Sequence, residues 1–357
     1  MKKNIWVLAL ILVLCLAFVN AGIVLSQGDF ESLSGWRQTA WVVFNREKLK
    51  NMEFVGTPST QTWSETEEYS LENTVVLQKE PGKDFVVMNL TDLHLNDFDY
   101  FGANNGRIFS HIRAMVEANQ PDLITISGDL FCTDSVAWSV HQFTEFMDSL
   151  GVYWAPVFGN HDDDGHCDQN YLADVMCQSQ YCLLQKGDPA MGVGNYIINI
   201  CEGDTIVHSM IMMDSHDDGL HENQYGWYRW AAEGANAPSS VILHIPILEH
   251  QLAYEAAWDG DGWKDGFDAF GSNREGVYYE DGSEGFFQIV KDVGLTQHII
   301  CGHDHINNFS ILYEGVRLTY SMRLGFYYTH HPDHLGATML TIDEDGNAAL
   351  SHVGRYE

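Results

Sequence analysis

From residue 84 onward the chain alternates between strand-like and helical segments, and this alternation limits the folds open to it. Three apolar runs predict strands, at 84–90, 122–127 and 152–158. Two segments with helical periodicity, 104–121 and 138–151, lie between them. Strand–helix–strand repeats of this kind are typical of βαβ units, so we predict an α/β domain with a largely parallel sheet.

Apolar residues give the first predicted helix a single buried face. Ile108, Ile112, Met115 and Val116 recur at the i, i+4, i+7 and i+8 spacing that puts side chains on one side of a helix. Pro121 follows them and ends the helical pattern. The segment therefore has one apolar side, as a helix that covers a sheet requires.

The pattern changes on either side of this region. Residues 195–214 predict two strands joined by a turn at Gly203 and Asp204, so we expect a more mixed sheet in the second half. Residues 22–83, rich in Ser, Thr, Glu and Trp, predict a small β-rich lead-in segment packed on the main domain. The main domain is expected to span 84–357.

The first 21 residues have the form of an export signal. Lys2 and Lys3 precede an unbroken apolar stretch, and Val19, Asn20 and Ala21 approximate a cleavage site. The apolar run is long for a signal, so an uncleaved membrane anchor is the alternative. We expect a secreted, periplasmic or otherwise extracytoplasmic protein, with no stable membrane partner unless this segment is retained.

Export also bears on the cysteines. Seven are present, and six of them follow the signal, an even number that permits disulfides in an oxidising compartment. Cys167, Cys177 and Cys182 are crowded together, so we expect at least one local bridge among them. Residues 161–168, HDDDGHCD, are expected to form a solvated acidic loop.

The charge of the chain excludes several classes of partner. Its formal net charge is −32, which repels nucleic acid and anionic membrane surfaces. Hydrophobic residues make up 45% of the 357 residues, enough for a substantial core. We therefore expect a folded domain that binds neither nucleic acid nor anionic membrane surfaces.

Metal-binding residue types follow five of the strand-like runs. The runs lead, in chain order, to Asp92 and His94, to Asp129, to Asn160 and His161, to His244, and to His303 and His305. Ligands of α/β sheets bind beyond the carboxyl ends of the strands. Carboxylates and imidazoles together suit Fe, Mn or Zn better than Ca or Mg. The sequence therefore predicts a metal site at the strand ends.

The order of these motifs resembles a known family. The series D-x-H, G-D, G-N-H-D, H and G-H-x-H is similar to the signature of the calcineurin-like metallophosphoesterases. The stretches "SGDLF", "VFGNHDD", "LHIP" and "CGHDH" look most like the purple-acid-phosphatase-like branch of that superfamily. The resemblance covers roughly residues 84–330. It implies a two-sheet β-sandwich flanked by helices, in four αββα layers, with two metal ions at the strand ends.

The resemblance also implies a role for each side chain at these strand ends. The implied ligands of the first metal ion are Asp92, His94, Asp129 and His305. The implied ligands of the second are Asp129, which would bridge both ions, and Asn160, His244 and His303. His161 matches the family's non-ligand histidine, which faces the phosphate and can donate a proton to the leaving oxygen.

The implied activity is that of a secreted dinuclear phosphohydrolase, in which a metal-bound hydroxide attacks a phosphate monoester. A phosphodiesterase acting on nucleotides or lipid head groups would need the same ligands, so it remains an alternative. A non-catalytic exported metal- or glycan-binding protein is a third, although every position of the signature is filled.

One position departs from the purple acid phosphatases proper. In that group a tyrosine three residues after the bridging aspartate binds ferric iron, and Cys132 stands at that position here. Iron held by tyrosinate is therefore not expected. We expect two divalent ions, Fe, Mn or Zn. The histidines outside the signature, such as His208 and His298, match no motif and are expected to have no ligand role.

Overall fold

The computed structural model describes residues 62–97, 104–132, 136–165 and 167–356, with the single positions 41, 45 and 48 before them. The predicted export signal and most of the predicted lead-in segment lie outside the described residues. Within the described part of the chain, no helix is both long and apolar enough to cross a membrane.

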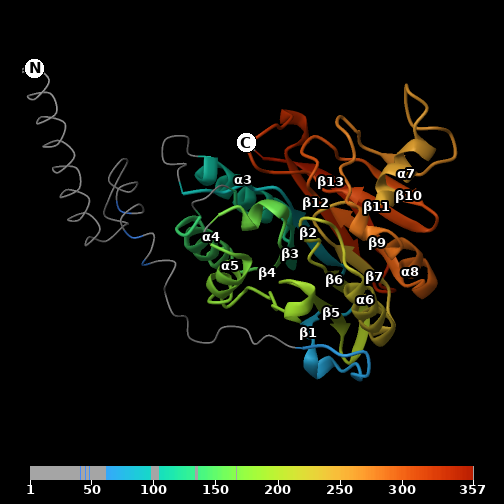
Figure 1. Cartoon of the computed structure of the whole chain (residues 1–357), viewed down its shortest axis with the longest axis horizontal. Helices are drawn as coiled ribbons and strands as arrows, with labels where there is room; N and C mark the ends of the chain where they lie inside the picture. The colour runs from blue at the N-terminus through green and yellow to red at the C-terminus, as the bar shows by residue number, and fades with distance from the viewer. Residues whose placement is uncertain are drawn as a thin grey trace, which may run out of the picture.

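Two sheets form the centre of the molecule (Figure 1). The smaller has five strands in the order β13 (Ala348–Gly354), β12 (Gly336–Ile342), β2 (Phe85–Leu90), β3 (Leu123–Ser127) and β4 (Tyr153–Val157). The larger has eight, in the order β1 (Val75–Gln78), β5 (Tyr196–Glu202), β6 (Thr205–Met212), β7 (Ser239–Ile242), β9 (Thr296–Cys301), β11 (Val316–Tyr320), β10 (Ser310–Tyr313) and β8 (Ala269–Phe270).

Helices cover the outer faces of both sheets. Helices α3 (Asn104–Asn119), α4 (Ser139–Asp148) and α5 (Gln169–Met176) pack with the five-stranded sheet. Helices α6 (Glu222–Ala235), α7 (Leu248–Ala257) and α8 (Phe286–Val293) pack with the eight-stranded sheet. The four-layer architecture implied by the resemblance is confirmed.

The inner faces of the two sheets share one hydrophobic core. Strand β3 is buried along its whole length, which explains why its sequence is a continuous apolar run rather than an alternating one. The predicted apolar face of α3 is confirmed, because Ile108, Ile112, Met115 and Val116 are all buried. Their side chains join the core that also contains residues of β5, β6 and β7.

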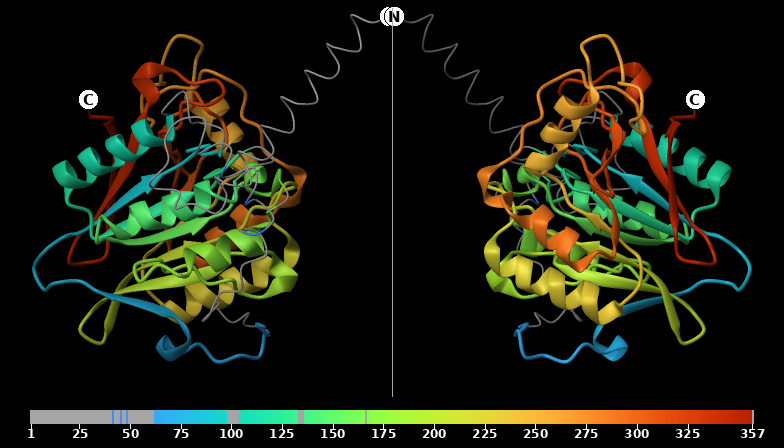
Figure 2. Two further views of the ribbon diagram at one scale, coloured as in Figure 1. Left: turned by 90° about the vertical axis from the view of Figure 1, so that its left-hand side faces the viewer. Right: turned by 90° about the vertical axis from the view of Figure 1, so that its right-hand side faces the viewer.

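The strand directions agree with the two halves of the sequence. Strands β2, β3 and β4 run parallel, as the βαβ pattern predicted. Strands β5 and β6 form an antiparallel hairpin at the predicted turn, so the second sheet is mixed. Strand β12 returns to the first sheet and pairs antiparallel with β2, where Figure 2 shows the red C-terminal strands beside the blue-green β2.

Strand β1 comes from the described end of the predicted lead-in segment. It pairs parallel with β5, from Val75 opposite Ile198 to Gln78 opposite Cys201, and forms the edge of the eight-stranded sheet. The end of this segment is therefore a strand of the main sheet rather than a separate β-unit.

The expected local disulfide is absent. All six cysteines after the predicted signal carry free thiols. Cys167 is buried in the core, while the Cys177 thiol contacts that of Cys182 and the Leu184 carbonyl. Neutral thiols are readily accommodated in apolar surroundings, and burial raises the pKa of Cys182 well above its usual range.

Buried histidines connect the two sheets. The His208 ring on β6 donates from Nδ1 to the Gly346 carbonyl in the β12–β13 turn, 2.8 Å away. His298 on β9 donates from Nε2 to the Ala348 carbonyl on β13, also at 2.8 Å. Burial lowers the pKa of both rings to about 4. Neither residue lies in the cluster at the strand ends.

Candidate metal centre and active site

The structure brings together the signature side chains from both sheets. Those from the five-stranded sheet follow β2, β3 and β4: Asp92, His94, Asp129, Asn160 and His161. Those from the eight-stranded sheet follow β7 and β9: His244, His303 and His305. Because the carboxyl ends of these parallel strands lie at the same edge, residues more than 200 positions apart in sequence converge, as the His94–His305 contact shows.

Four of these residues form a compact group, Asp92, His94, Asp129 and His305, whose ligand atoms all lie within 4.8 Å of one another. His94 Nε2 is 3.6 Å from Asp92 Oδ1 and 3.6 Å from Asp129 Oδ2. His305 Nε2 is 3.5 Å from Asp92 Oδ1. Two carboxylates and two imidazoles therefore face one point.

A second group lies on the other side of Asp129. His244 Nε2 is 3.3 Å from Asp129 Oδ1, and His303 Nδ1 is 3.0 Å from Asn160 Oδ1. The rings of His244 and His303 meet edge to face, with centroids 5.2 Å apart. The two oxygens of Asp129 thus face different groups, Oδ2 toward His94 and Oδ1 toward His244.

The polar atoms of the cluster fit cations better than they fit one another. Among the described residues, Asp92 Oδ1, Asp129 Oδ2 and His244 Nε2 are buried and have no hydrogen-bond partner. Buried polar atoms are normally satisfied, so three such atoms in one cluster need an explanation. Metal ions bound by carboxylate oxygens and imidazole nitrogens, one in each group, would satisfy these three atoms.

Neighbouring groups fix the orientation of these side chains. His244 Nδ1 donates to the Ser127 carbonyl at 2.8 Å, so Nε2 turns toward Asp129. The Thr91 hydroxyl donates to Asp92 Oδ2 at 2.8 Å, which leaves Asp92 Oδ1 for the cluster. Outer hydrogen bonds of this kind hold metal ligands in their binding geometry.

The backbone around the cluster is held in uncommon conformations. Asp92, His94, Asp129 and His303 all have positive φ, between 50° and 78°. Such conformations are costly for residues other than glycine and occur often at functional sites. Gly159 is required by a close approach, because a Cβ there would lie 2.3 Å from Asp129 Oδ1.

Burial and neighbouring charges set the protonation states of the side chains in the cluster. Burial alone would raise the pKa of Asp92, but neighbouring histidines hold it well below its usual range. Burial lowers the pKa of His303 to about 4 and that of His305 to about 3, so both rings are neutral near pH 7. Burial would also lower the pKa of His244, but Asp129 raises it to about 10. Metal binding at this position would therefore displace a proton.

His161 stands at the edge of the cluster rather than within it. Its backbone N–H donates to Asp129 Oδ1 at 3.0 Å, while its ring is partly exposed. Nδ1 lies 2.6 Å from Asp164 Oδ2. A carboxylate on Nδ1 holds the imidazole in one orientation and leaves Nε2 free. The ring centroid is 5.4 Å from that of His94.

Asp162 was not predicted to have a structural role. The expectation of a solvated acidic loop is wrong at this position, because Asp162 is buried. Its Oδ1 accepts from Phe131 N–H and its Oδ2 from Gly159 N–H, both at 2.8 Å. Burial raises its pKa to about 8. Asp162 therefore ties together the loops that follow β3 and β4.

Cys132 and Asp304 lie beside the cluster without joining it. The Cys132 thiol donates to the His94 carbonyl, with Sγ 3.3 Å from the oxygen. Burial, followed by the charge of Asp129, raises its pKa to about 12, so Cys132 stays a neutral thiol. Asp304 accepts hydrogen bonds from the Tyr320 hydroxyl and from Tyr278 N–H. These contacts anchor the loop that carries His303 and His305.

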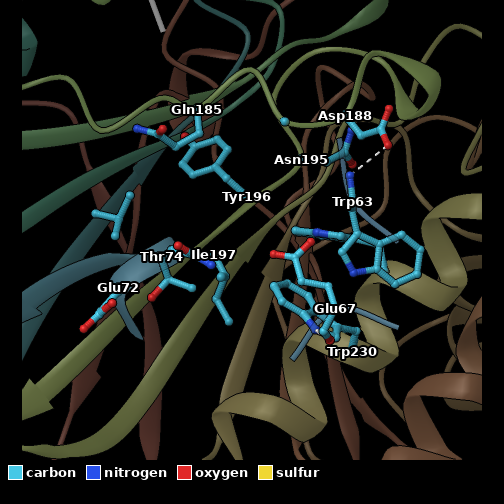
Figure 3. Close-up of a pocket in the computed structure, with 14 residues that line it drawn as sticks. Trp63, Glu67, Glu72, Thr74, Gln185, Asp188, Asn195, Tyr196, Ile197 and Trp230 are labelled. Carbon is cyan, nitrogen blue, oxygen red and sulfur yellow. Dashed lines mark hydrogen bonds between the residues drawn. The ribbon is translucent and has the colours of Figure 1, made fainter. Parts of the chain in front are cut away.

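A cavity of about 300 Å³ lies between the described lead-in residues and α6, and none of its lining residues belongs to the cluster (Figure 3). Trp63 N–H donates to Asp188 Oδ2 at 3.0 Å, and Trp230 Nε1 donates to the Glu67 carbonyl at 2.8 Å. These hydrogen bonds attach the lead-in residues to the main domain.

The two-sheet fold and the Asp and His side chains gathered at its strand ends are features of a protein class with a candidate metal site between two sheets. The chain belongs to the calcineurin-like phosphoesterase family, whose sequence profile matches residues 85–307.

Known proteins support this assignment. The chain is 24% identical over 300 residues to an Arabidopsis thaliana protein named probable inactive purple acid phosphatase 28, covering 70% of this chain and 72% of that protein. It is 23% identical over 302 residues to phosphatase DCR2 of Saccharomyces cerevisiae, covering 72% of this chain and 49% of the yeast protein. A dimetal phosphatase from Danio rerio has a similar fold, with a TM-score of 0.54 and 12% identity over 77% of this chain and 98% of that one.

Proposed function

We propose that the protein is an exported, dinuclear metal-dependent phosphohydrolase that cleaves phosphate monoesters. One observation carries the proposal: all eight signature side chains are present, and they converge on one site with Asp129 between the two groups. Some relatives are named inactive, so the completeness of this set is the feature that favours catalysis. In particular, His161 and its partner Asp164 are not needed for binding a metal alone.

The ligand set supports two divalent ions, Fe, Mn or Zn. Asp92, His94 and His305 would hold the first, and Asn160, His244 and His303 the second. Asp129 would be shared between them, with one oxygen for each.

When bound, the two ions would supply positive charge for the phosphoryl oxygens and a water activated at mild pH. The chain's own residues then have distinct tasks. The fixed carboxylates and imidazoles would hold the ions, and through them the phosphate, at the strand ends. His161 Nε2 would donate a proton to the leaving-group oxygen, because Nδ1 is taken by Asp164. Asp164 would stabilise the imidazolium and keep Nε2 turned toward the substrate.

The test combines metal analysis with two chromogenic substrates. Purified protein is loaded with Zn, Mn or Fe, its metal content is measured, and its rates on an aryl phosphate monoester and on the matching diester are compared. We expect two ions per chain and faster cleavage of the monoester. Faster cleavage of the diester would favour the phosphodiesterase alternative. Two tightly bound ions without any turnover would favour a non-catalytic role.

A further inference from the structure

A tyrosine that is absent from the signature covers the histidines of the site. Tyr328 lies in the loop after β11, and its ring stacks on that of His161 with centroids 5.4 Å apart and planes 22° apart. It also meets His94 edge to face at 5.1 Å and lies 6.1 Å from the ring of His305. The residue remains 47% exposed, so part of its ring covers the site and part faces solvent.

The backbone of this tyrosine is in the left-handed region. Tyr328 has a φ of +59°, a backbone conformation that residues other than glycine rarely adopt. Such a conformation persists only where surrounding contacts hold it, and it is found often at ligand-binding sites. The contacts that hold Tyr328 are therefore important to its role.

Arg323 supplies those contacts. Its side chain is buried, and the residue is only 2% exposed. Nη2 donates to the Tyr327 carbonyl at 2.8 Å and Nη1 to the Thr329 carbonyl at 2.5 Å. Nη2 also approaches the carbonyl of Asp92 at 3.4 Å. One guanidinium thus forms hydrogen bonds with the residues on both sides of Tyr328 and connects them to the segment that follows β2.

The start of the loop is tied to the same segment through its backbone. Leu324 N–H donates to the Thr91 carbonyl at 3.2 Å, and Gly325 N–H donates to the Asp92 carbonyl at 3.0 Å. A Cβ on Gly325 would lie 2.2 Å from the backbone carbonyl oxygen of Asp92, so only glycine allows this close approach. The position of Tyr328 is therefore coupled to the position of Asp92.

We propose that Tyr328, held in place by Arg323, forms the wall against which the leaving group packs and gives the site a preference for phosphate esters with a planar aromatic leaving group. This rests on the proposed function, because the proton donor His161 places the leaving group beside Tyr328. Aromatic rings pack favourably against one another in stacked or edge-to-face arrangements, whereas a small alkyl group gains little from such a wall. In this arrangement Arg323 is a positioning residue and Tyr328 contacts the substrate.

Binding of two phosphonates that cannot be hydrolysed tests the wall directly. Metal-loaded protein is titrated calorimetrically with phenylphosphonate and with methylphosphonate. We expect about tenfold tighter binding of the phenyl compound. Tyr328→Leu should lose most of this preference, while Tyr328→Phe should keep it. Tyr153→Leu, which changes an exposed tyrosine at the opposite end of β4, should keep it as well.

Kinetics provide the second readout. The ratio of kcat/KM for phenyl phosphate to kcat/KM for glycerol phosphate should fall about tenfold in Tyr328→Leu, mainly through KM. Arg323→Lys, which loosens the loop but keeps the charge, should lower the same ratio. The proposal is overturned if neither phosphonate binds, if both bind equally, or if Tyr328→Leu keeps the preference. If the wild-type protein hydrolyses neither ester, the proposed function fails, and the phosphonate comparison still decides the role of Tyr328.

Discussion

His161 and Asp164 form a hydrogen-bonded pair at the edge of the candidate metal cluster. His94 and His244 are buried and the His305 side chain is 17% exposed, whereas the His161 side chain is 31% exposed and hydrogen-bonded to a carboxylate. An exposed imidazole with one nitrogen fixed can exchange protons with solvent between turnovers. These features support the proposed role of His161 as the proton donor.

We predict that His161→Ala keeps its metal ions and loses turnover by about 10²–10⁴-fold, the usual contribution of a general acid. The loss should shrink for esters with very good leaving groups, because these depart without a proton. Steady-state kinetics with a series of aryl phosphates, alongside elemental analysis, would measure both effects. His221→Ala, which removes the histidine of another exposed His–Asp pair outside the cluster, serves as the control. A parallel loss of metal and activity would show that His161 is a ligand.

Among the elements, the strands and the side chains that follow them were the most predictable features. Each depends on a local pattern, such as the apolar run of β3 followed by Gly128 and Asp129. The hydrogen bonds from Arg323 to the Tyr327 and Thr329 carbonyls were not predictable. No local sequence pattern pairs a guanidinium with those carbonyls or with the Asp92 carbonyl beyond β2.

Other features escaped prediction because they depend on contacts between distant segments. Asp162 resembles its exposed acidic neighbours in sequence, and only the approach of the Phe131 and Gly159 amides makes it a buried acceptor. Likewise, the sequence shows that Cys177 and Cys182 are close together along the chain, but closeness in sequence does not establish that a disulfide forms.

The stability that buried histidines contribute by connecting the two sheets should depend on pH. The buried His208 ring on β6 donates to the Gly346 carbonyl and lies 3.0 Å from the Ser240 hydroxyl, and its burial disfavours the charged form. Burial lowers its folded-state pKa to about 4 from an ordinary value of 6.5. Between these values the unfolded chain binds the extra proton. The stability from this group is therefore complete above pH 6.5 and is lost as the pH falls toward 4.

The free energy of unfolding of the wild-type protein should fall between pH 6.5 and pH 4 in part because the unfolded chain binds one more proton at His208. We predict that His208→Gln makes this fall smaller by about 3 kcal/mol, which corresponds to the difference between the two pKa values. Glutamine can still donate to the Gly346 carbonyl but does not titrate. Urea denaturation at a series of pH values would measure the change, with exposed His330→Gln as the matched control. Equal acid sensitivity in His208→Gln and in wild type would contradict this role.

For the molecule as a whole, the cluster joins the two sheets. Asp92, Asp129 and Asn160 follow strands of the smaller sheet, and His244, His303 and His305 follow strands of the larger. Ions bound at this position would hold both sheets together and would bind the folded state in preference to the unfolded one. Metal binding should therefore stabilise the whole fold.

We predict that removing metal with a chelator lowers the thermal unfolding midpoint of the entire domain. A site with free ion at 100 times its Kd would contribute about 2.7 kcal/mol. Calorimetry of metal-loaded and chelated protein would measure the shift. Asp129→Ala should lack most of it, because that carboxylate lies between both groups, while exposed Asp163→Ala should retain it. A shift of normal size in Asp129→Ala would contradict the bridging role.

The return of β12 to the first sheet has a consequence for the newly made chain. Asp92 follows β2, whose neighbour on one side is β12, from Gly336 to Ile342 near the C-terminus. A ribosome must therefore release almost the full chain before β2 gains both of its neighbours and the strand ends come into register. Metal should enter only after synthesis is complete, so a chain that crosses a membrane as it is made would receive its ions on the far side.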